Sequence, residues 1–113
     1  PMAMPKFILL IREDLTRYPM EDAQLQSIIN AHRNWAKNLS ERGLFIAGNG
    51  MPEQGAIVEI IGDKVVASPL RDVKEGVGGF YIIQAESFDA AVEIAKECPT
   101  FSDGDKIEVR PLM

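Results

Sequence analysis

The 113-residue chain has one cysteine, one histidine, no run of basic residues and no long apolar run. The single cysteine, Cys98, excludes an internal disulfide and is typical of a protein kept in a reducing cytoplasm. A zinc site needs several Cys or His ligands, so we expect no metal. The glycines of residues 76–79 precede a strand and do not open a helix, so they form no nucleotide fingerprint, and we expect no cofactor. The longest apolar stretch, residues 7–11, is far too short to span a bilayer, and we expect no membrane partner.

The charge balance is acidic, with 17 Asp and Glu against 12 Lys and Arg. Phosphate recognition needs clustered basic residues, so we expect no nucleic-acid partner and no membrane-surface helix. Hydrophobic residues make up 46% of the chain, which is enough for one core. We expect a single domain over residues 6–113, preceded by a disordered or cloning-derived start over residues 1–5, because Met4 fits a native first residue.

The densest signal in the sequence is residues 74–83, where three glycines within four residues precede an apolar run rich in aromatic and β-branched side chains. Glycine permits backbone angles and close approaches that a side chain would block. The run after the glycines is typical of a buried strand. The pattern therefore predicts a loop that leads tightly into a central strand, a common way to build one wall of a pocket.

Hydrophobic periodicity predicts six strands and two helices. The expected strands are 6–12, 44–47, 56–61, 64–67, 79–85 and 107–111, and the expected helices are 21–42 and 88–97. Gly62 and Asp63 are a two-residue hairpin signal between the third and fourth strands. The Gly, Asn and Pro content of residues 48–52 predicts a loop. The first strand is apolar on both faces and should be central, whereas Pro111 should push the last strand to an edge.

Two amphipathic helices and several strands fit an α+β sandwich of the ferredoxin-like kind, with an antiparallel sheet and both helices on one face. Such a sheet leaves its other face without helices. A second copy of the chain could cover that face, and we therefore expect a homodimer.

His32 is the first candidate for chemistry, since an imidazole can act as a general base near neutral pH. It lies on the apolar stripe of the first helix, beside Ile28 and Trp35. The alternative is a histidine at the edge of the core, satisfied by one hydrogen bond. Trp35 could likewise be a stacking platform for a ligand or an ordinary core residue.

The loop before the glycines carries charges that could bind a polar or anionic ligand and orient His32. These charged residues are Arg71, Asp72, Lys74 and Glu75. The alternative is a solvated surface loop. Met51 belongs to a segment that could form another pocket wall or an ordinary turn at the end of a strand.

Several stretches together resemble the YCII-related family, also called DGPF-domain proteins. They are residues 6–11 (KFILLI), 43–48 (GLFIAG), 74–75 (KE), 78–81 (GGFY), 98–99 (CP) and 108–112 (EVRPL). The resemblance covers nearly the whole chain. The name-giving Asp-Gly-Pro-Phe is reduced here to Ala67-Ser68-Pro69-Leu70, so that only the proline remains.

The resemblance implies a dimeric α+β barrel fold of the ferredoxin-like kind, a pocket in each subunit and a cytoplasmic bacterial protein. Some relatives are small enzymes without a cofactor, including a dehydrochlorinase, and some occur beside or fused to sigma factors. Shorter relatives carry a His in the first helix that is proposed to act with an Asp. His32 matches that His in register, and Cys98 occupies the place of the Asp.

Two functions are expected from these observations. The first is a cofactor-independent lyase or isomerase acting on a small cyclic or aromatic acid, with His32 as the base. In it Asp72 or Glu75 would orient the imidazole, Arg71 or Lys74 would hold the anion, and Trp35, Met51 and Tyr81 would contact the substrate. The second is a non-catalytic small-molecule-binding or regulatory dimer linked to a transcription factor. A purely structural interaction module is a third possibility.

Overall fold

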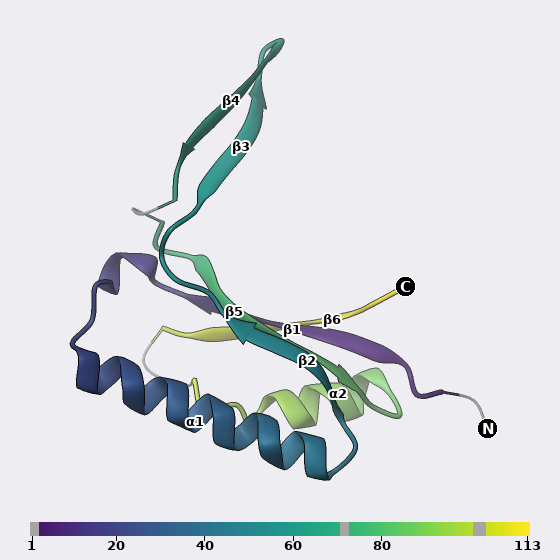
Figure 1. Cartoon of the computed structure of the whole chain (residues 1–113). Helices are drawn as coiled ribbons and strands as arrows, with labels where there is room; N and C mark the ends of the chain where they lie inside the picture. The colour runs from purple at the N-terminus through teal and green to yellow at the C-terminus, as the bar shows by residue number, and fades with distance from the viewer. Residues whose placement is uncertain (1–2, 71–72, 101–103) are drawn as a thin grey trace.

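The structure, a computed structural model, describes residues 3–70, 73–100 and 104–113. A four-stranded antiparallel sheet carries two helices on one face, and a separate hairpin projects from the other side (Figure 1). The sheet strands are β1 (Lys6–Glu13), β2 (Phe45–Gly50), β5 (Gly76–Gln84) and β6 (Lys106–Pro111), and the hairpin strands are β3 (Ala56–Ile61) and β4 (Lys64–Pro69). The helices are α1 (Asp22–Glu41), α2 (Phe88–Ala95) and a short 3-10 turn, η1 (Leu15–Arg17). The predicted α+β, ferredoxin-like sandwich is confirmed.

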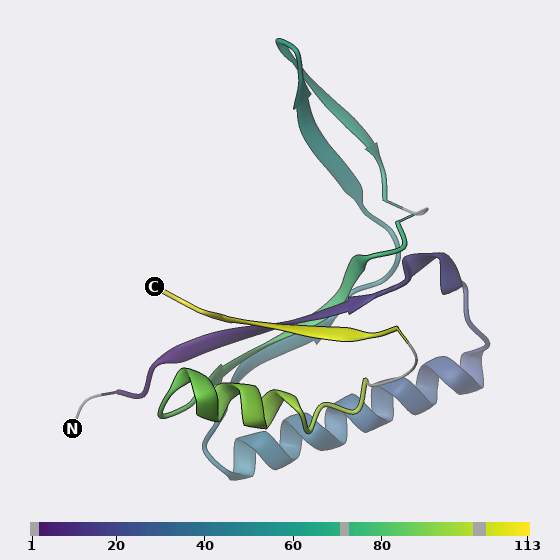
Figure 2. The ribbon, with the colours of Figure 1, turned by 180° about the vertical axis from the view of Figure 1, so that it is seen from behind.

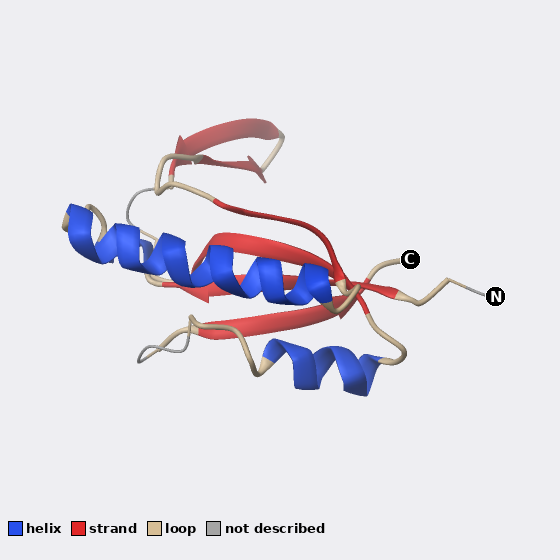
Figure 3. Ribbon diagram, turned by 60° about the horizontal axis from the view of Figure 1, so that its bottom comes forward, coloured by secondary structure: helices blue, strands red, loops and turns tan. Residues whose placement is uncertain are grey.

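The sheet order is β2-β5-β1-β6, so β1 is central and β6 lies at an edge, as predicted. Alternate side chains of a strand point to opposite faces. On β1, Phe7, Leu9 and Ile11 face the helices and are buried, whereas Ile8 and Leu10 face the side without helices. Figure 3 shows both helices lying on the same side of the sheet. The core therefore lies between the helices and one face of the sheet.

The prediction of a loop from residue 48 onward is wrong for three residues. Gly48, Asn49 and Gly50 extend β2 and pair with β5. A Cβ on Gly48 would lie 3.1 Å both from the ring of Tyr81 and from the carbonyl oxygen of Phe80. Gly48 therefore lets β2 pack closely against β5, and it does not form a turn.

The glycine segment at the start of β5 packs closely, as predicted, but it already belongs to the strand. β5 begins at Gly76, three residues before the predicted start. Side chains at Gly76 and Gly78 would collide with those of Leu15 and Glu13. The constraint is stronger at Gly76, because Leu15 is buried and cannot easily move, whereas the carboxylate end of Glu13 near Gly78 can turn away.

The apolar stripe of α1 is buried only in its second half. Trp35 and Leu39 are buried, whereas Ile28 in the first half is 39% exposed. The helix has 20 residues and is therefore about 30 Å long. Figure 1 shows its first half extending along the sheet toward η1. The helix ends as predicted, with Gly43 in the left-handed region at φ 73°.

The second helix begins as predicted and ends earlier. The Ser87 hydroxyl accepts a hydrogen bond from the Ala90 amide at 3.1 Å, which is an N-cap contact. The helix ends at Ala95, two residues before the predicted end. In the part of the chain that the structure describes, no helix is long and apolar enough to cross a membrane. Pro5 in the predicted leading segment is tied to the fold, since its carbonyl accepts from the Ala85 amide at 3.1 Å.

Candidate functional site

The imidazole of His32 lies between two hydroxyl groups. Its Nδ1 is 2.6 Å from the Tyr81 hydroxyl, and its Nε2 is 2.6 Å from Thr100 Oγ1. The three residues come from α1, β5 and the segment that follows α2. That segment passes close to α1, as Figure 2 shows from behind. Both ring nitrogens of the only histidine are thus hydrogen-bonded within the chain.

The aromatic neighbours of His32 fix its position against the sheet. Tyr81 is 5% exposed and points to the helix side of β5, opposite Leu9 of β1. Its ring stacks on the imidazole with centroids 5.8 Å apart, and its centroid lies 4.8 Å from that of Trp35 in an edge-to-face arrangement. His32 and Trp35 are three residues apart on α1 and so share one face of the helix. The predicted residues His32, Trp35 and Tyr81 are therefore brought together.

Burial controls the protonation of this site. Desolvation lowers the pKa of His32 below its ordinary value, because a charged imidazole loses hydration there. Burial also raises the pKa of the Tyr81 hydroxyl, so that it stays protonated. At neutral pH the site is a neutral imidazole between two neutral hydroxyls.

A neutral imidazole has one donor and one acceptor nitrogen, and this geometry allows two arrangements. In the first, Tyr81 donates to Nδ1 and Nε2–H donates to Thr100. In the second, Nδ1–H donates to the Tyr81 oxygen and Thr100 donates to Nε2, while the Tyr81 hydroxyl can donate to the His32 carbonyl at 3.4 Å. Going from one arrangement to the other moves a proton across the ring. In either arrangement one ring nitrogen keeps a lone pair that could accept a proton once its hydroxyl partner turns away.

Residues at the end of α2 complete the surroundings. Cys98 is buried, and desolvation raises the pKa of its thiol, an effect that hydrogen bonds with Thr100 partly offset. The Trp35 indole donates to Glu97 at 3.4 Å, and Glu97 in turn accepts from Arg42 at 2.7 Å. The hydrogen bond from Arg42 lowers the pKa of Glu97, which keeps that carboxylate charged. Burial and the raised pKa of the Cys98 thiol disfavour its reactive thiolate form.

An open groove begins one helical turn before His32. It has a volume of about 440 Å³. Its described lining residues are Met20, Ala23, Gln24, Ser27 and Ile28. Ile28 precedes His32 by four residues and lies on the same side of α1. His32 itself is not among the lining residues, and its ring nitrogens are bonded to Tyr81 and Thr100.

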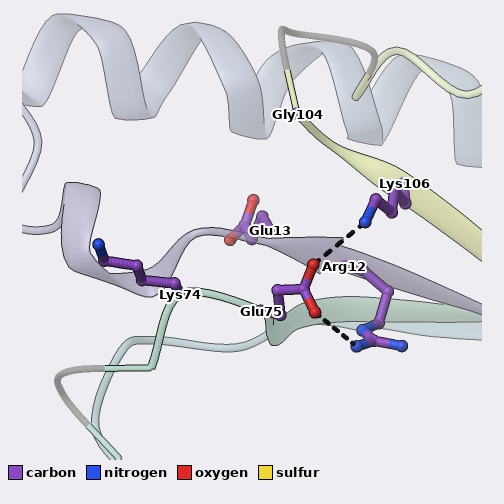
Figure 4. A pocket seen from close by; sticks show the side chains of 6 residues that line it. All are labelled: Arg12, Glu13, Lys74, Glu75, Gly104 and Lys106. Atoms are coloured by element: carbon purple, nitrogen blue, oxygen red, sulfur yellow. Dashed lines mark hydrogen bonds and ion pairs between the residues drawn. The ribbon is translucent and has the colours of Figure 1, made fainter.

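The structure places Glu75 and Lys74 elsewhere. Glu75 accepts from Lys106 at 3.1 Å and lies 3.9 Å from Arg12, two residues that pair on the sheet face without helices. Figure 4 shows Glu75 between these two cations, with Lys74 pointing away. The depression that they line has a volume of about 20 Å³, room for about one water. The partners of His32 are hydroxyls, and Glu75 is not among them.

The remaining predicted residues do not join His32 in the described structure. Met51 is 39% exposed, and its amide donates to the Gly78 carbonyl at 2.8 Å, next to the glycine segment. Arg71 and Asp72 lie outside the described residues. Among the described residues, no group of three or more His, Cys, Asp or Glu side chains could hold a metal ion.

Sequence reasoning missed Thr100. The only sequence signal for Thr100 was its closeness to Cys98. Cys98 occupies the place of the Asp that the resemblance implies as the partner of the histidine, and Thr100 follows it by two residues. Thr100 is 7% exposed, so its hydroxyl lies inside the described fold. A buried hydroxyl needs a partner, and the imidazole supplies one.

Comparison with protein families finds a match to the YCII-related domain over residues 6–113. Comparison with curated proteins finds no match.

Proposed function

Because the chain belongs to the YCII-related domain family, we propose that it is a cofactor-independent enzyme of the lyase or isomerase type with His32 as its general base. One observation carries the proposal: the imidazole is held at 2.6 Å on each side by the hydroxyls of Tyr81 and Thr100. This arrangement fixes the orientation of a neutral imidazole. One ring nitrogen donates its N–H to a hydroxyl, and the other nitrogen keeps the lone pair that a general base needs. The family match establishes the domain and not the reaction, so the activity rests on the geometry of the site.

The proposed proton transfer uses Nε2 of His32. Thr100 belongs to the connection after α2, whereas Tyr81 is fixed inside the sheet, so Thr100 is the partner that a substrate can replace. Rotation of the Thr100 side chain frees the lone pair of Nε2, with the ring proton on Nδ1 donated to Tyr81. Nε2 then takes a proton from a substrate carbon: the C–H bond breaks, an N–H bond forms, and the electron pair stays on the substrate as an enolate. Returning the proton to another carbon gives an isomerisation, and expulsion of an anionic leaving group gives an elimination.

The groove that begins one helical turn before His32 suits a small, partly apolar substrate. Met20 and Ile28 offer apolar surface, and Gln24 and Ser27 offer an amide and a hydroxyl. This combination suits a ring with one or two polar substituents. We propose a small cyclic or aromatic acid, the class that the resemblance implies.

The decisive experiment is proton exchange catalysed in D₂O. The protein is incubated with a panel of unsaturated lactone acids and substituted benzoates, and deuterium incorporation or product formation is followed by mass spectrometry. We expect one class of compound to exchange, with the rate falling by about a hundredfold or more in His32→Gln, the usual contribution of a general base. Full turnover by His32→Gln would refute the assignment of the base.

Two conservative variants separate proton transfer from packing. Tyr81→Phe keeps the ring and removes the hydroxyl at Nδ1, and Thr100→Val keeps the shape and removes the hydroxyl at Nε2. Thr100→Val should retain most of the activity, because the substrate replaces that hydroxyl. Tyr81→Phe should lose activity, because the imidazole is no longer oriented. Equal activity of both variants and wild type would contradict the proposed roles.

One observation favours a second function. Both ring nitrogens already have internal partners, which is also what a binding site without catalysis would show. In that case the chain is a small-molecule-binding dimer, perturbed by ligand at His32, without exchange in D₂O. NMR titration of the single histidine with the same compounds distinguishes the two functions, since binding alone shifts its signals and produces no exchange.

We propose that the chain acts in the cytoplasm as a homodimer formed through the sheet face without helices. Four apolar side chains lie at the centre of that face: Ile8, Leu10, Phe80 and Ile82. Charged pairs on β1 and β6, such as Arg12 with Glu108 at 2.8 Å, border this centre. An apolar centre with a polar rim is the usual anatomy of an interface. Sedimentation velocity should show a dimer for wild type and a monomer for Leu10→Glu.

A further inference from the structure

The hairpin of β3 and β4, hereafter the arm, has one face without any polar side chain. The strand register places Ile60 opposite Val65 and Val58 opposite Ala67. Residues that pair across two antiparallel strands point to the same side. The apolar face of the arm therefore consists of Ala56, Val58, Ile60, Val65, Ala67 and Pro69. The opposite face is mixed and carries both Glu59 and Lys64.

The apolar face of the arm is strongly exposed in the single chain. Val58, Ile60 and Val65 are 67%, 75% and 71% exposed, and every residue of both strands is exposed. An isolated two-stranded hairpin is marginally stable in water, and its edges are open to pairing. The base is held to the domain, since the Leu70 amide donates to the Gly55 carbonyl at 3.0 Å. The arm is thus anchored at one end and uncovered along its length.

The direction in which the arm projects indicates which molecule it contacts. Figures 1 and 2 show it projecting from the side of the sheet opposite the helices. That is the side on which the proposed second copy would lie. Each arm strand has six residues and is therefore about 20 Å long, whereas stacked sheets lie about 10 Å apart. The arm is long enough to pass alongside the sheet of a second copy.

The proposed sheet interface alone would bury little new apolar area, so the arm could add to the area buried in the dimer. The central side chains Ile8, Leu10, Phe80 and Ile82 are already partly buried in the single chain. A stable interface buries about 800 Å² on each partner, and side chains that are already half-covered add little to that area. Apart from the terminal Met113, the three large residues of the apolar face of the arm are the most exposed large apolar side chains of the described chain. The arm carries two acidic residues and one basic residue, which disfavours a nucleic-acid partner.

We propose that the arm is a clasp between subunits: in the dimer, the apolar face of each arm packs against the side of the second copy. The inference rests on the proposed dimer and adds a second contact region, separate from the sheet faces. The dimer interface then consists of a central sheet contact with an arm on each side. The two-fold symmetry of such a dimer makes the arm contact occur twice.

Two adjacent residues of the same type test the clasp. Ile60 is 75% exposed on the apolar face, and Ile61 is 60% exposed on the mixed face. Ile60→Lys places a charge in the proposed contact and should raise the dimer dissociation constant about tenfold or more, because a buried apolar contact is lost in both arms of the dimer. Ile61→Lys, the matched control, should change it by less than about twofold, as expected for a residue outside a contact. Sedimentation equilibrium over a dilution series measures the constant, and circular dichroism shows that both variants are folded.

Further outcomes separate the clasp from the dimer. Equal effects of the two lysine variants, or no effect of either, would overturn the clasp. A dimer that Leu10→Glu dissociates and Ile60→Lys leaves unchanged would retain the sheet interface and reject the arm contact. A wild type that is monomeric at all concentrations would overturn both. Hydrogen exchange of the unmodified protein gives independent evidence: amides of the arm should be protected in the dimer and lose that protection on dilution.

Discussion

The protonation of His32 gives a prediction that isolates one residue. Burial lowers its pKa in the folded chain, whereas the unfolded chain has the ordinary value of about 6.5. Below pH 6.5 the unfolded chain therefore binds more protons than the folded chain, and lower pH favours unfolding. The free energy of unfolding should be constant just above this range and should fall as the pH drops from 6.5 toward the folded pKa.

The magnitude follows from the number of protons involved. One histidine allows a slope of at most about 1.4 kcal/mol per pH unit, reached where the folded imidazole is neutral and the unfolded one is charged. His32 is the only histidine, so no other imidazole contributes between pH 5.5 and 7.5. Carboxylates with lowered pKa values, such as Glu97, lose their contribution only at lower pH.

Urea unfolding at several pH values and one fixed protein concentration measures this slope, the fixed concentration being needed if the chain dimerises. His32→Gln is the matched control, because an amide can still contact both hydroxyls and does not titrate. The variant should show no slope between pH 5.5 and 7.5. A flat wild type, a slope of opposite sign, or the same slope in the variant would refute the account of His32 as a desolvated neutral base.

Three other predictions concern packing. Leu39→Ala should lower the free energy of unfolding by about 2–5 kcal/mol in urea titration, because Leu39 is fully buried and its loss leaves a cavity; a loss well under 1 kcal/mol would contradict that burial. Gly76→Ala should cost about 1–3 kcal/mol by the same measurement, since its Cβ would collide with Leu15, and an unchanged stability would mean that Leu15 moves freely. Cys98 should resist a thiol reagent such as DTNB in the folded protein and react on unfolding, because it is buried with a raised pKa; rapid reaction of the native protein would show that the end of α2 opens.

Much of the fold follows from local patterns in the sequence. The apolar run of β1 placed it in the centre, and Pro111 placed β6 at an edge, because a buried strand needs apolar residues on both faces and an edge tolerates a missing amide. Gly62 and Asp63 predicted the hairpin turn correctly. The end of β2 was predicted wrongly because Gly48 has the same local signature in a turn and in a strand that packs closely. Only the neighbouring Tyr81 ring distinguishes the two.

The site was also predictable only in part, because local patterns place some of its residues and long-range contacts place the others. Helical spacing brought His32 and Trp35 to one face, and strand alternation turned Tyr81 toward them. Thr100 joins them through the path of the chain after α2, which no local pattern encodes. The side of the sheet on which Glu75 lies depends on the register of β1, β5 and β6, and that also is a property of long-range pairing. Sequence therefore located His32 and Tyr81 in one site, but it predicted neither the hydrogen bond between them nor the second partner, Thr100.

The identity of those partners determines which chemistry His32 can perform. A carboxylate beside an imidazole stabilises its charged form and raises its pKa, whereas a hydroxyl supplies a hydrogen bond without that charge. Where the resemblance implies an Asp, this chain has Cys98, and Thr100 makes the contact instead. The imidazole therefore keeps a lowered pKa and stays neutral over the physiological range. A base of this kind suits substrates whose C–H bond is already acidified by a neighbouring carbonyl or ring, because the site itself offers little charge stabilisation for the imidazolium that forms.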